Sequence, residues 1–173
     1  MAVATEFLEL PVKGVMTLHP AAVGPEDSLE DAARIMVEGG FRHVPVLDAD
    51  DRLVGMLSER DVRARLGVEV ERFPAASRDA LGEDVEAVMS RDPITVGPDA
   101  PLRDVVGILA GEKVGALPVV DEEERLLGII SYLDLLSYLH REGAATAAAP
   151  EVATLPPARA ARATLPSPRS RRG

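Results

Sequence analysis

The chain contains one sequence twice. Residues 15–61 align with residues 88–134 at a constant offset of 73 without a gap, and 17 of the 47 aligned positions are identical. About three identities would be expected by chance at ordinary amino-acid usage, so the segment is duplicated. A unit of about 50 residues buries too little surface to be comfortably stable alone. We therefore expect the two copies to cover each other's exposed sheet faces, with a pseudo-two-fold axis and a cleft between them.

The local pattern of the first copy predicts the element order β-α-β-β-α. A short extended segment at Ala22-Val23 ends at Gly24-Pro25, and a helix follows that Asp27 or Ser28 can cap. Gly39-Gly40 can end that helix. Two short strands at 44–47 and 53–57 come next, joined by an acidic turn, and a second helix opens after residue 58. The second copy repeats this order, so the predicted fold class is α/β with two tandem repeats.

These features divide the chain into four parts. We expect the first repeat at residues 10–66, a connector at 67–82, and the second repeat at residues 83–143, with a short helix leading into Val88-Met89. Residues 144–173 contain ten Ala, five Pro and five Arg, with no aromatic residue and no helical or alternating pattern. Such a composition cannot build a packed core, so this segment is predicted to be a disordered tail.

The composition argues against several classes of function. The chain has no cysteine and only three histidines, so thiolate nucleophiles, thiolate zinc sites and a His-based metal centre are not expected. Aromatic residues make up 3% of the chain, which argues against base-stacking platforms for single-stranded nucleic acid. No phosphate loop with a lysine and no nucleophile–base arrangement is present. We expect a protein that is not an enzyme and requires no cofactor or metal.

The charge distribution bears on partners and location. The net charge is −10, made up of −14 from residues 1–140 (13 basic, 27 acidic) and +4 from residues 141–173 (6 basic, 2 acidic). So acidic a chain does not attract nucleic acid by bulk charge, and any anion must meet a local basic site. Residues 1–10 show no secretory signal, and no stretch approaches the roughly 18 apolar residues of a membrane span. A cytoplasmic protein without a membrane segment is expected.

The most informative motif is a glycine-containing strand that ends at a serine, with an aspartate three residues later. Its two occurrences are Gly55, Ser58, Asp61 and Gly128, Ser131, Asp134. At a helix start, backbone N–H groups and a serine hydroxyl can bind phosphate, and an aspartate one turn in can accept hydrogen bonds from ribose hydroxyls. The same Ser-x-x-Asp spacing also forms a capping box, in which both side chains only satisfy backbone N–H groups. On the residues alone, both interpretations stay open.

Taken together, the repeated motifs resemble the CBS domain, the module named after cystathionine β-synthase. The first copy carries VMT..P..V.P...L.DAA, RHVPV.D and LVGMLSERD, and the second carries VMSRDPITV.P...L.DVV, ALPVVD and LLGIISYLD. The chain is thus similar to a tandem CBS pair, or Bateman module, over about residues 10–141. This resemblance implies a homodimeric regulatory fold that binds AMP, ADP, ATP, NAD or S-adenosylmethionine between the repeats. It also implies that Ser58 and Ser131 face phosphate and that Asp61 and Asp134 hold ribose hydroxyls.

The two motifs differ in their neighbours. The first is surrounded by cations, whereas the corresponding positions of the second copy are uncharged: Arg42, His43, Arg60 and Arg63 against Gly115, Ala116, Leu133 and Leu136. Charge-assisted hydrogen bonds to phosphate need cations. We therefore expect the Ser58–Asp61 site to prefer a phosphorylated ligand, and the Ser131–Asp134 site to take a less charged adenosyl ligand or to stand empty. The alternative is that these arginines form surface ion pairs with nearby acids.

The resemblance adds three further candidate ligand-binding residues. Val23, Thr95 and Val96 occupy the family's first strand, whose backbone faces adenine. As plain core strand residues they would need no ligand.

Two hypotheses for the function follow. The first is a stand-alone cytoplasmic regulatory module, in which an adenosine-type ligand bridges the repeats and changes their orientation or dimer packing, signalling to an effector protein. The alternative is a ligand-independent dimerisation or protein-docking module, in which both Ser-Asp motifs are only helix caps. The leucine-rich helix at 133–139 is the expected dimer contact face, and nucleic-acid binding through the arginine-containing tail is not favoured.

Overall fold

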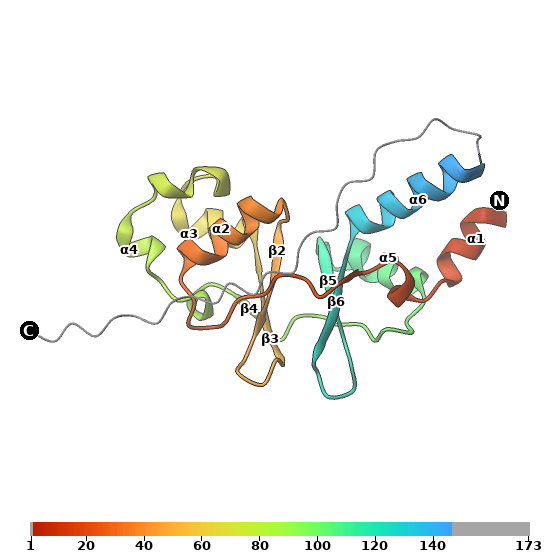
Figure 1. The fold of residues 1–173 in the computed structure, drawn as a ribbon, viewed down its shortest axis with the longest axis horizontal. Coiled ribbons are helices and arrows are strands. Elements are labelled where there is room, and N and C mark those ends of the chain that lie inside the picture. Colours follow the sequence, from red (N-terminus) through yellow and green to blue (C-terminus); the bar gives the residue numbers. More distant parts are fainter. Residues whose placement is uncertain (1, 147–173) are drawn as a thin grey trace, which may run out of the picture.

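The structure, a computed structural model, describes residues 2–146. From the N-terminus its elements are α1 (Ala2–Glu9), η1 (Val12–Gly14), β1 (Thr17–Leu18), α2 (Leu29–Gly39), β2 (His43–Leu47), β3 (Leu53–Ser58) and α3 (Glu59–Leu66). They continue as η2 (Val70–Ala75), α4 (Arg78–Leu81), η3 (Val85–Ala87), β4 (Ser90–Arg91), α5 (Leu102–Gly111), β5 (Ala116–Val120), β6 (Leu126–Ser131) and α6 (Tyr132–Thr146). Two three-stranded sheets lie side by side, with their helices on the outer sides (Figure 1). The predicted α/β class and repeated element order are confirmed.

The predicted tail at 144–173 lies almost entirely outside the described residues. Its first three positions belong to helix α6, which continues to Thr146. Within the described range, no helix is both long enough and apolar enough to cross a bilayer.

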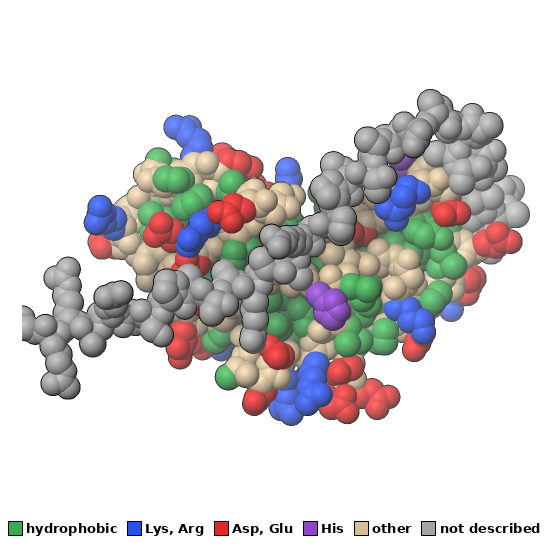
Figure 2. All heavy atoms as spheres, viewed as in Figure 1, with side chains coloured by type: hydrophobic (Ala, Val, Ile, Leu, Met, Phe, Trp, Pro, Cys, Tyr) green, Lys and Arg blue, Asp and Glu red, His purple; other side chains and the backbone are tan. Residues whose placement is uncertain are grey.

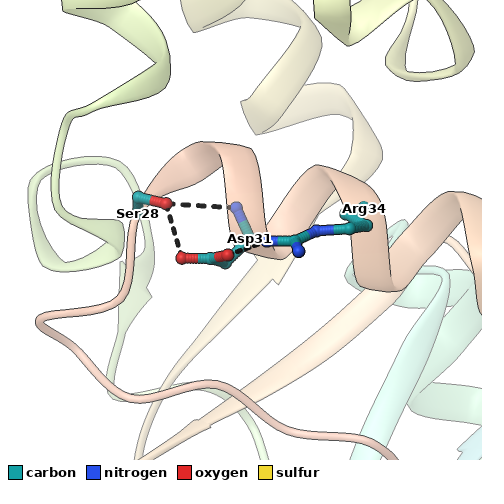
Figure 3. Close-up of polar contacts among 3 residues, drawn as sticks. All are labelled: Ser28, Asp31 and Arg34. Atoms are coloured by element: carbon teal, nitrogen blue, oxygen red, sulfur yellow. Dashed lines mark hydrogen bonds and ion pairs between the residues drawn. The ribbon is translucent and has the colours of Figure 1, made fainter. Parts of the chain in front are cut away.

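Helix α2 shows how local sequence sets an element's limits. The Asp31 N–H donates to Ser28 Oγ at 3.1 Å and Ser28 Oγ donates to Asp31 Oδ2 at 2.7 Å, while Arg34 forms an ion pair with Asp31 (Figure 3). Gly40 ends the helix in the left-handed conformation at φ 67°, which costs glycine little because it has no Cβ. The buried stripe of the helix packs with β2 and β3: Leu29, Ala32, Ala33 and Met36. The predicted helix and its glycine end are confirmed, and of the two candidate caps, Asp27 and Ser28, Ser28 is the one that caps it.

The opening strand of each copy completes the sheet of the other copy. Strand β1 pairs antiparallel with β6, where Leu18 lies opposite Gly128. Strand β4 pairs antiparallel with β3, where Arg91 lies opposite Gly55. The sheet orders are therefore β1-β6-β5 and β2-β3-β4. The local pattern did not predict this exchange, which ties the two copies together through backbone hydrogen bonds.

The extended segments predicted at Ala22-Val23 and Thr95-Val96 lie at the opposite edges of the sheets. Val23 forms a parallel bridge with Val46 of β2, and Val96 forms the equivalent bridge with Val119 of β5. In each case the valine N–H donates to the carbonyl of the proline that precedes its partner, at 3.1 Å. Both valines are buried, so they belong to the cores of their own copies.

The exchange extends from the strands to the cores. Three residues of the N-terminal segment are buried in the core of the second copy: Phe7, Val12 and Val15. Leu81 of the connector, and Val85 and Met89 at the start of the second repeat, are buried in the core of the first copy. Helix α1 packs on α5, and the Phe7 ring lies 5.5 Å from the Tyr138 ring of α6, between centroids. The sequence pattern does not predict α1, whose counterpart at the offset of 73 is α4.

Replacing Gly128 by alanine tests how strongly the exchanged pairing stabilises the fold. An added Cβ at Gly128 would lie 2.7 Å from the Thr17 carbonyl oxygen, a backbone atom of β1, so the strand would have to shift. We expect Gly128→Ala to lower the free energy of unfolding by about 1–3 kcal/mol. Urea denaturation followed by circular dichroism measures the change.

The matched control is Gly107→Ala, because Gly107 lies inside α5 and an added Cβ would have nothing within 4 Å. Alanine is the better helix former, so this substitution should raise the free energy of unfolding by about 0.5–1 kcal/mol. If Gly128→Ala proves as stable as the wild type, the exchanged pairing does not determine stability.

Candidate functional site

A cleft of about 760 Å³ lies between the two copies. One wall comes from Arg42 and His43 at the start of β2, together with the end of β3 and the first turns of α3 (residues 56–63). Residues 90–94 adjoin this wall, because their strand β4 pairs with β3, and the other wall comes from residues 109–118, which lead from α5 into β5. The cleft predicted between the copies is therefore present, and both copies line it.

Ser58 and Asp61 form a capping box at the start of α3. The Asp61 N–H donates to Ser58 Oγ at 3.3 Å, while the Ser58 N–H and hydroxyl donate to Asp61 Oδ2 at 3.0 and 2.5 Å. The capping interpretation of the motif is thus realised in the structure. It uses only one carboxylate oxygen, and no donor among the described residues reaches Asp61 Oδ1. Asp61 is half-buried and lines the cleft, so this oxygen can still accept a hydrogen bond from a ligand.

The second motif has the same capping hydrogen bonds, but its aspartate also accepts a hydrogen bond from the other copy. The Ser131 N–H and hydroxyl donate to Asp134 Oδ2 at 2.7 and 2.6 Å. In addition, the Thr17 hydroxyl of the exchanged strand β1 donates to Asp134 Oδ1 at 3.1 Å. The counterpart of Thr17 at the offset of 73 is Ser90, for which the structure shows no matching bond to Asp61. Both oxygens of Asp134 are therefore engaged, whereas one oxygen of Asp61 is available.

The His43 side chain of the first copy lies against the backbone of Gly115 in the second copy. An ideal Cβ built on Gly115 would lie 2.5 Å from His43 Cε1 and 2.8 Å from Nε2, so only glycine permits this approach. At the corresponding position the first copy has Arg42. Burial lowers the pKa of His43 from its ordinary value of 6.5, with Asp61 opposing this shift and the Arg60 charge adding to it. The imidazole is thus held in its neutral form, against the facing backbone.

The predicted cations fall into two groups. Arg42 is paired with Glu59 at 3.2 Å and Arg63 with Glu69 at 3.4 Å, so surface ion pairing accounts for these two. Arg60 lines the cleft and has no ion-pair partner among the described residues.

Two further cations that the sequence motifs did not predict line the cleft. Arg91 lies on the exchanged strand β4 and is paired with Glu86 at 2.8 Å. Lys113 follows α5 and has no ion-pair partner within the described part of the chain. Neither position carries a cation in the first copy, where the counterparts are Leu18 and Gly40. Comparing the copies position by position for unmatched charges would have found them.

The remaining predicted site residues lie outside this cleft. Val23 and Val96 are buried core residues, and Thr95 is exposed but does not line the cleft, although its neighbour Ile94 does. Ser131 and Asp134 occupy the equivalent site of the other copy, beside β1. The structure therefore brings together Arg42, His43, Ser58, Arg60 and Asp61 from the predicted set.

One group of carboxylates among the described residues has the spacing of a metal site. Oxygens of Glu59, Glu69 and Glu71 lie within 4.8 Å of one another. Two of the three side chains already neutralise arginines, and two are exposed. The ion pairs account for this cluster without a metal.

Replacing His43 by glutamine tests the electrostatics of the cleft. Because the folded pKa of His43 lies below its unfolded value, the unfolded chain binds a proton there more readily. His43 should therefore stabilise the fold fully above about pH 6.5 and progressively less as the pH falls through that value. As the pH is lowered from about 7.5 to about 5.5, we expect the free energy of unfolding to fall less in His43→Gln than in the wild type. Urea denaturation measures the difference.

His19→Gln is the control for this measurement, because His19 is an exposed histidine outside the cleft. It removes an imidazole without changing the cleft. A His43→Gln variant with the full pH dependence of the wild type would show that the pKa of His43 is not lowered.

Comparison with known proteins agrees with the duplicated architecture. A family model for the CBS domain matches residues 12–67 and 85–141. The chain is 37% identical over 117 residues to the MJ1225 protein of Methanocaldococcus jannaschii, covering 66% of this chain and 41% of that protein. It is 36% identical over 113 residues to inosine-5′-monophosphate dehydrogenase of Korarchaeum cryptofilum, covering 65% of this chain and 21% of the enzyme. The chain thus spans less than half the length of either relative.

Solved structures show the same arrangement of two repeats. The crystal structure of CBSX2 in complex with AMP superposes with a TM-score of 0.66 at 27% sequence identity, covering 78% of this chain and 98% of that one. The family model matches each copy of the duplicated segment separately, and the two matches together cover more than half of the chain. The chain belongs to the CBS domain family, and its two repeats form a CBS domain pair.

Proposed function

We propose that this CBS pair is a cytoplasmic regulatory module that binds an adenosine-containing ligand in the cleft between residues 56–63 and 109–118. The position of the Asp61 carboxylate is the observation on which this proposal rests. Its carboxylate lines a cleft bounded by both repeats, and one of its two oxygens has no donor among the described residues. A half-buried carboxylate that lines a cleft and has one oxygen without a donor is suited to accept hydrogen bonds from the hydroxyls of a ribose.

The charges beside Asp61 favour a phosphorylated ligand. Arg60 has no carboxylate partner among the described residues, Arg42 lines the same cleft, and the neutral His43 ring beside them can donate one N–H. On a chain with a net charge of −10, such a group of cations offers the local basic site that an anion requires. The structure of CBSX2 with AMP supports the same class of ligand for this chain.

We expect the equivalent site at Asp134 to behave differently. The Thr17 hydroxyl occupies the second carboxylate oxygen, and Leu133 and Leu136 stand where the first copy has Arg60 and Arg63. A ligand would have to displace the Thr17 hydrogen bond and would find no arginine at those two positions. This site is proposed to take a less charged adenosyl ligand or to stand empty.

Signalling would follow from the position of the ligand between the copies. A ligand that contacts both walls favours one relative orientation of the repeats, and so shifts the population toward it. An effector protein that contacts the outer helices would sense that orientation. We propose a regulatory role without catalysis, with repeats at residues 10–66 and 83–143 as the units that move.

A specific observation also favours the second candidate function, dimerisation or protein docking. Four large apolar side chains of α6 are 41–58% exposed: Tyr132, Leu133, Leu136 and Leu139. Figure 2 shows exposed hydrophobic side chains on the half of the molecule that holds α1, α5 and α6, and others on the opposite half. Exposed apolar groups on one helix are typical of a protein–protein contact. A homodimer through α6 is compatible with ligand binding, so the two functions can coexist.

Asparagine substitutions at the two aspartates test the ligand site. Asp61→Asn should weaken ATP binding about tenfold or more in isothermal titration calorimetry, because a charge-assisted hydrogen bond to the ligand is lost. Asp134→Asn is the matched variant, since both aspartates have the same capping bonds, and it should change the ATP affinity less than about twofold.

Equal losses in both variants would overturn the proposed difference between the sites. If the wild-type chain shows no thermal stabilisation by millimolar AMP, ATP, NAD or S-adenosylmethionine, the ligand function fails. The docking function would then be favoured.

Replacing Leu136 by glutamate tests the α6 contact. A charge at this exposed position should move the full chain toward the monomer in sedimentation velocity, because burying an unpaired carboxylate in an interface is strongly unfavourable. Val37→Glu is a control at another exposed apolar position, on α2, and should leave the sedimentation of the chain unchanged. A wild-type chain that is monomeric at high concentration would overturn the proposed homodimer.

A further inference from the structure

The backbone at Lys113 adopts a conformation that lysine rarely takes. Lys113 has a φ of 55°, in the left-handed region, and follows Glu112, the C-cap residue of α5. At the corresponding position the first copy has Gly40, which ends α2 at φ 67°. A side chain in this region crowds the backbone, and for this reason glycine is the common residue at such helix ends. The second copy therefore carries a strained lysine where the duplicated sequence shows that glycine fits.

The side chain at this strained position faces the ligand cleft. Lys113 lines the cleft from the second copy, and Arg60 lines it from the first. Of the five lysine and arginine side chains that line it, the other three are each paired with a glutamate. Of these five, Arg60 and Lys113 have no carboxylate in ion-pair range among the described residues. Two cations without ion-pair partners thus lie on opposite walls of the cleft, which the carboxylates of Asp61 and Asp92 also line.

His43 and Gly115 bring these two walls together. The His43 ring approaches the Gly115 backbone so closely that a Cβ at Gly115 would clash, and Lys113 is only two residues before that glycine. Arg60 lies near enough to His43 to lower its pKa. The basic side chains of both copies are therefore gathered at one place, with Asp61 at the same end of α3 as Arg60.

We propose that Lys113 and Arg60 together bind the polyphosphate chain of a nucleoside di- or triphosphate, so that the cleft discriminates against a monophosphate. This inference rests on the proposed adenosine site at Asp61 and names its ligand class. A ligand held at Asp61 through its ribose extends its phosphates toward the cations. A single phosphate reaches the cations of one wall, whereas a chain of two or three phosphates contacts both. The strain at Lys113 persists because the lysine supplies the second contact.

Calorimetry on the full chain tests this with AMP, ATP and inorganic tripolyphosphate. The wild type should bind ATP at least about tenfold more tightly than AMP. Lys113→Gly should lose about tenfold in affinity for ATP and tripolyphosphate, change its affinity for AMP less than about twofold, and raise the Tm by a few degrees as the strain is relieved. Lys113→Arg keeps the charge and should retain the affinity for ATP.

Glu124→Gly is the matched control, because Glu124 also has a left-handed backbone, with φ 62°, in an exposed turn away from the cleft. It should raise the Tm similarly and leave all three affinities unchanged. Equal binding of AMP and ATP by the wild type, or full ATP affinity in Lys113→Gly, would overturn this inference while the adenosine site stands. Tripolyphosphate binding that depends on Lys113, without binding of any adenosine ligand, would support the cation pair and overturn the adenosine site.

Discussion

The antiparallel pairing of β1 with β6 and of β4 with β3 is the interaction on which the rest of the structure depends. It carries the opening segment of each copy into the other copy, so each core contains side chains from both. The same exchange places residues 90–94 in one wall of the cleft, beside the start of α3. It also brings Thr17 to Asp134. Neither site would have its present neighbours if each copy had closed its own sheet.

Local features of the fold were predicted from the sequence, because a few adjacent residues encode them. Ser28 and Gly40 limit α2, and the serine that ends β3 opens α3. The strand exchange could not be predicted this way, because residues 17–18 and 90–91 have equivalent places in the duplicated pattern. Which sheet accepts which strand depends on the path of the chain between distant residues. For the same reason, α1 was missed, since it lies before the detectable repeat and its burial comes from α5 and Tyr138.

The candidate site shows the same division between local and long-range information. The Ser-x-x-Asp motif and the cations next to it are sequence-local, and five of the predicted residues line one cleft. The difference between the two sites rests on contacts across long sequence separations: Thr17 with Asp134, and His43 with Gly115. A duplication supplies two equal sites, and a few substitutions at facing positions make them chemically unequal. Positions where the copies disagree are therefore more informative about function than positions where they agree.

The exchanged strands also bear on how such a chain could arise. A single repeat has an opening strand that does not close its own sheet, and its sheet has an edge that lacks a partner strand. A second, identical repeat supplies both, so two separate copies of an ancestral half-length chain would satisfy each other as a symmetric dimer. Gene duplication and fusion would then preserve a contact that already existed between molecules. Joining the copies in one polypeptide also freed each half to mutate independently, which a homodimer of identical chains does not allow.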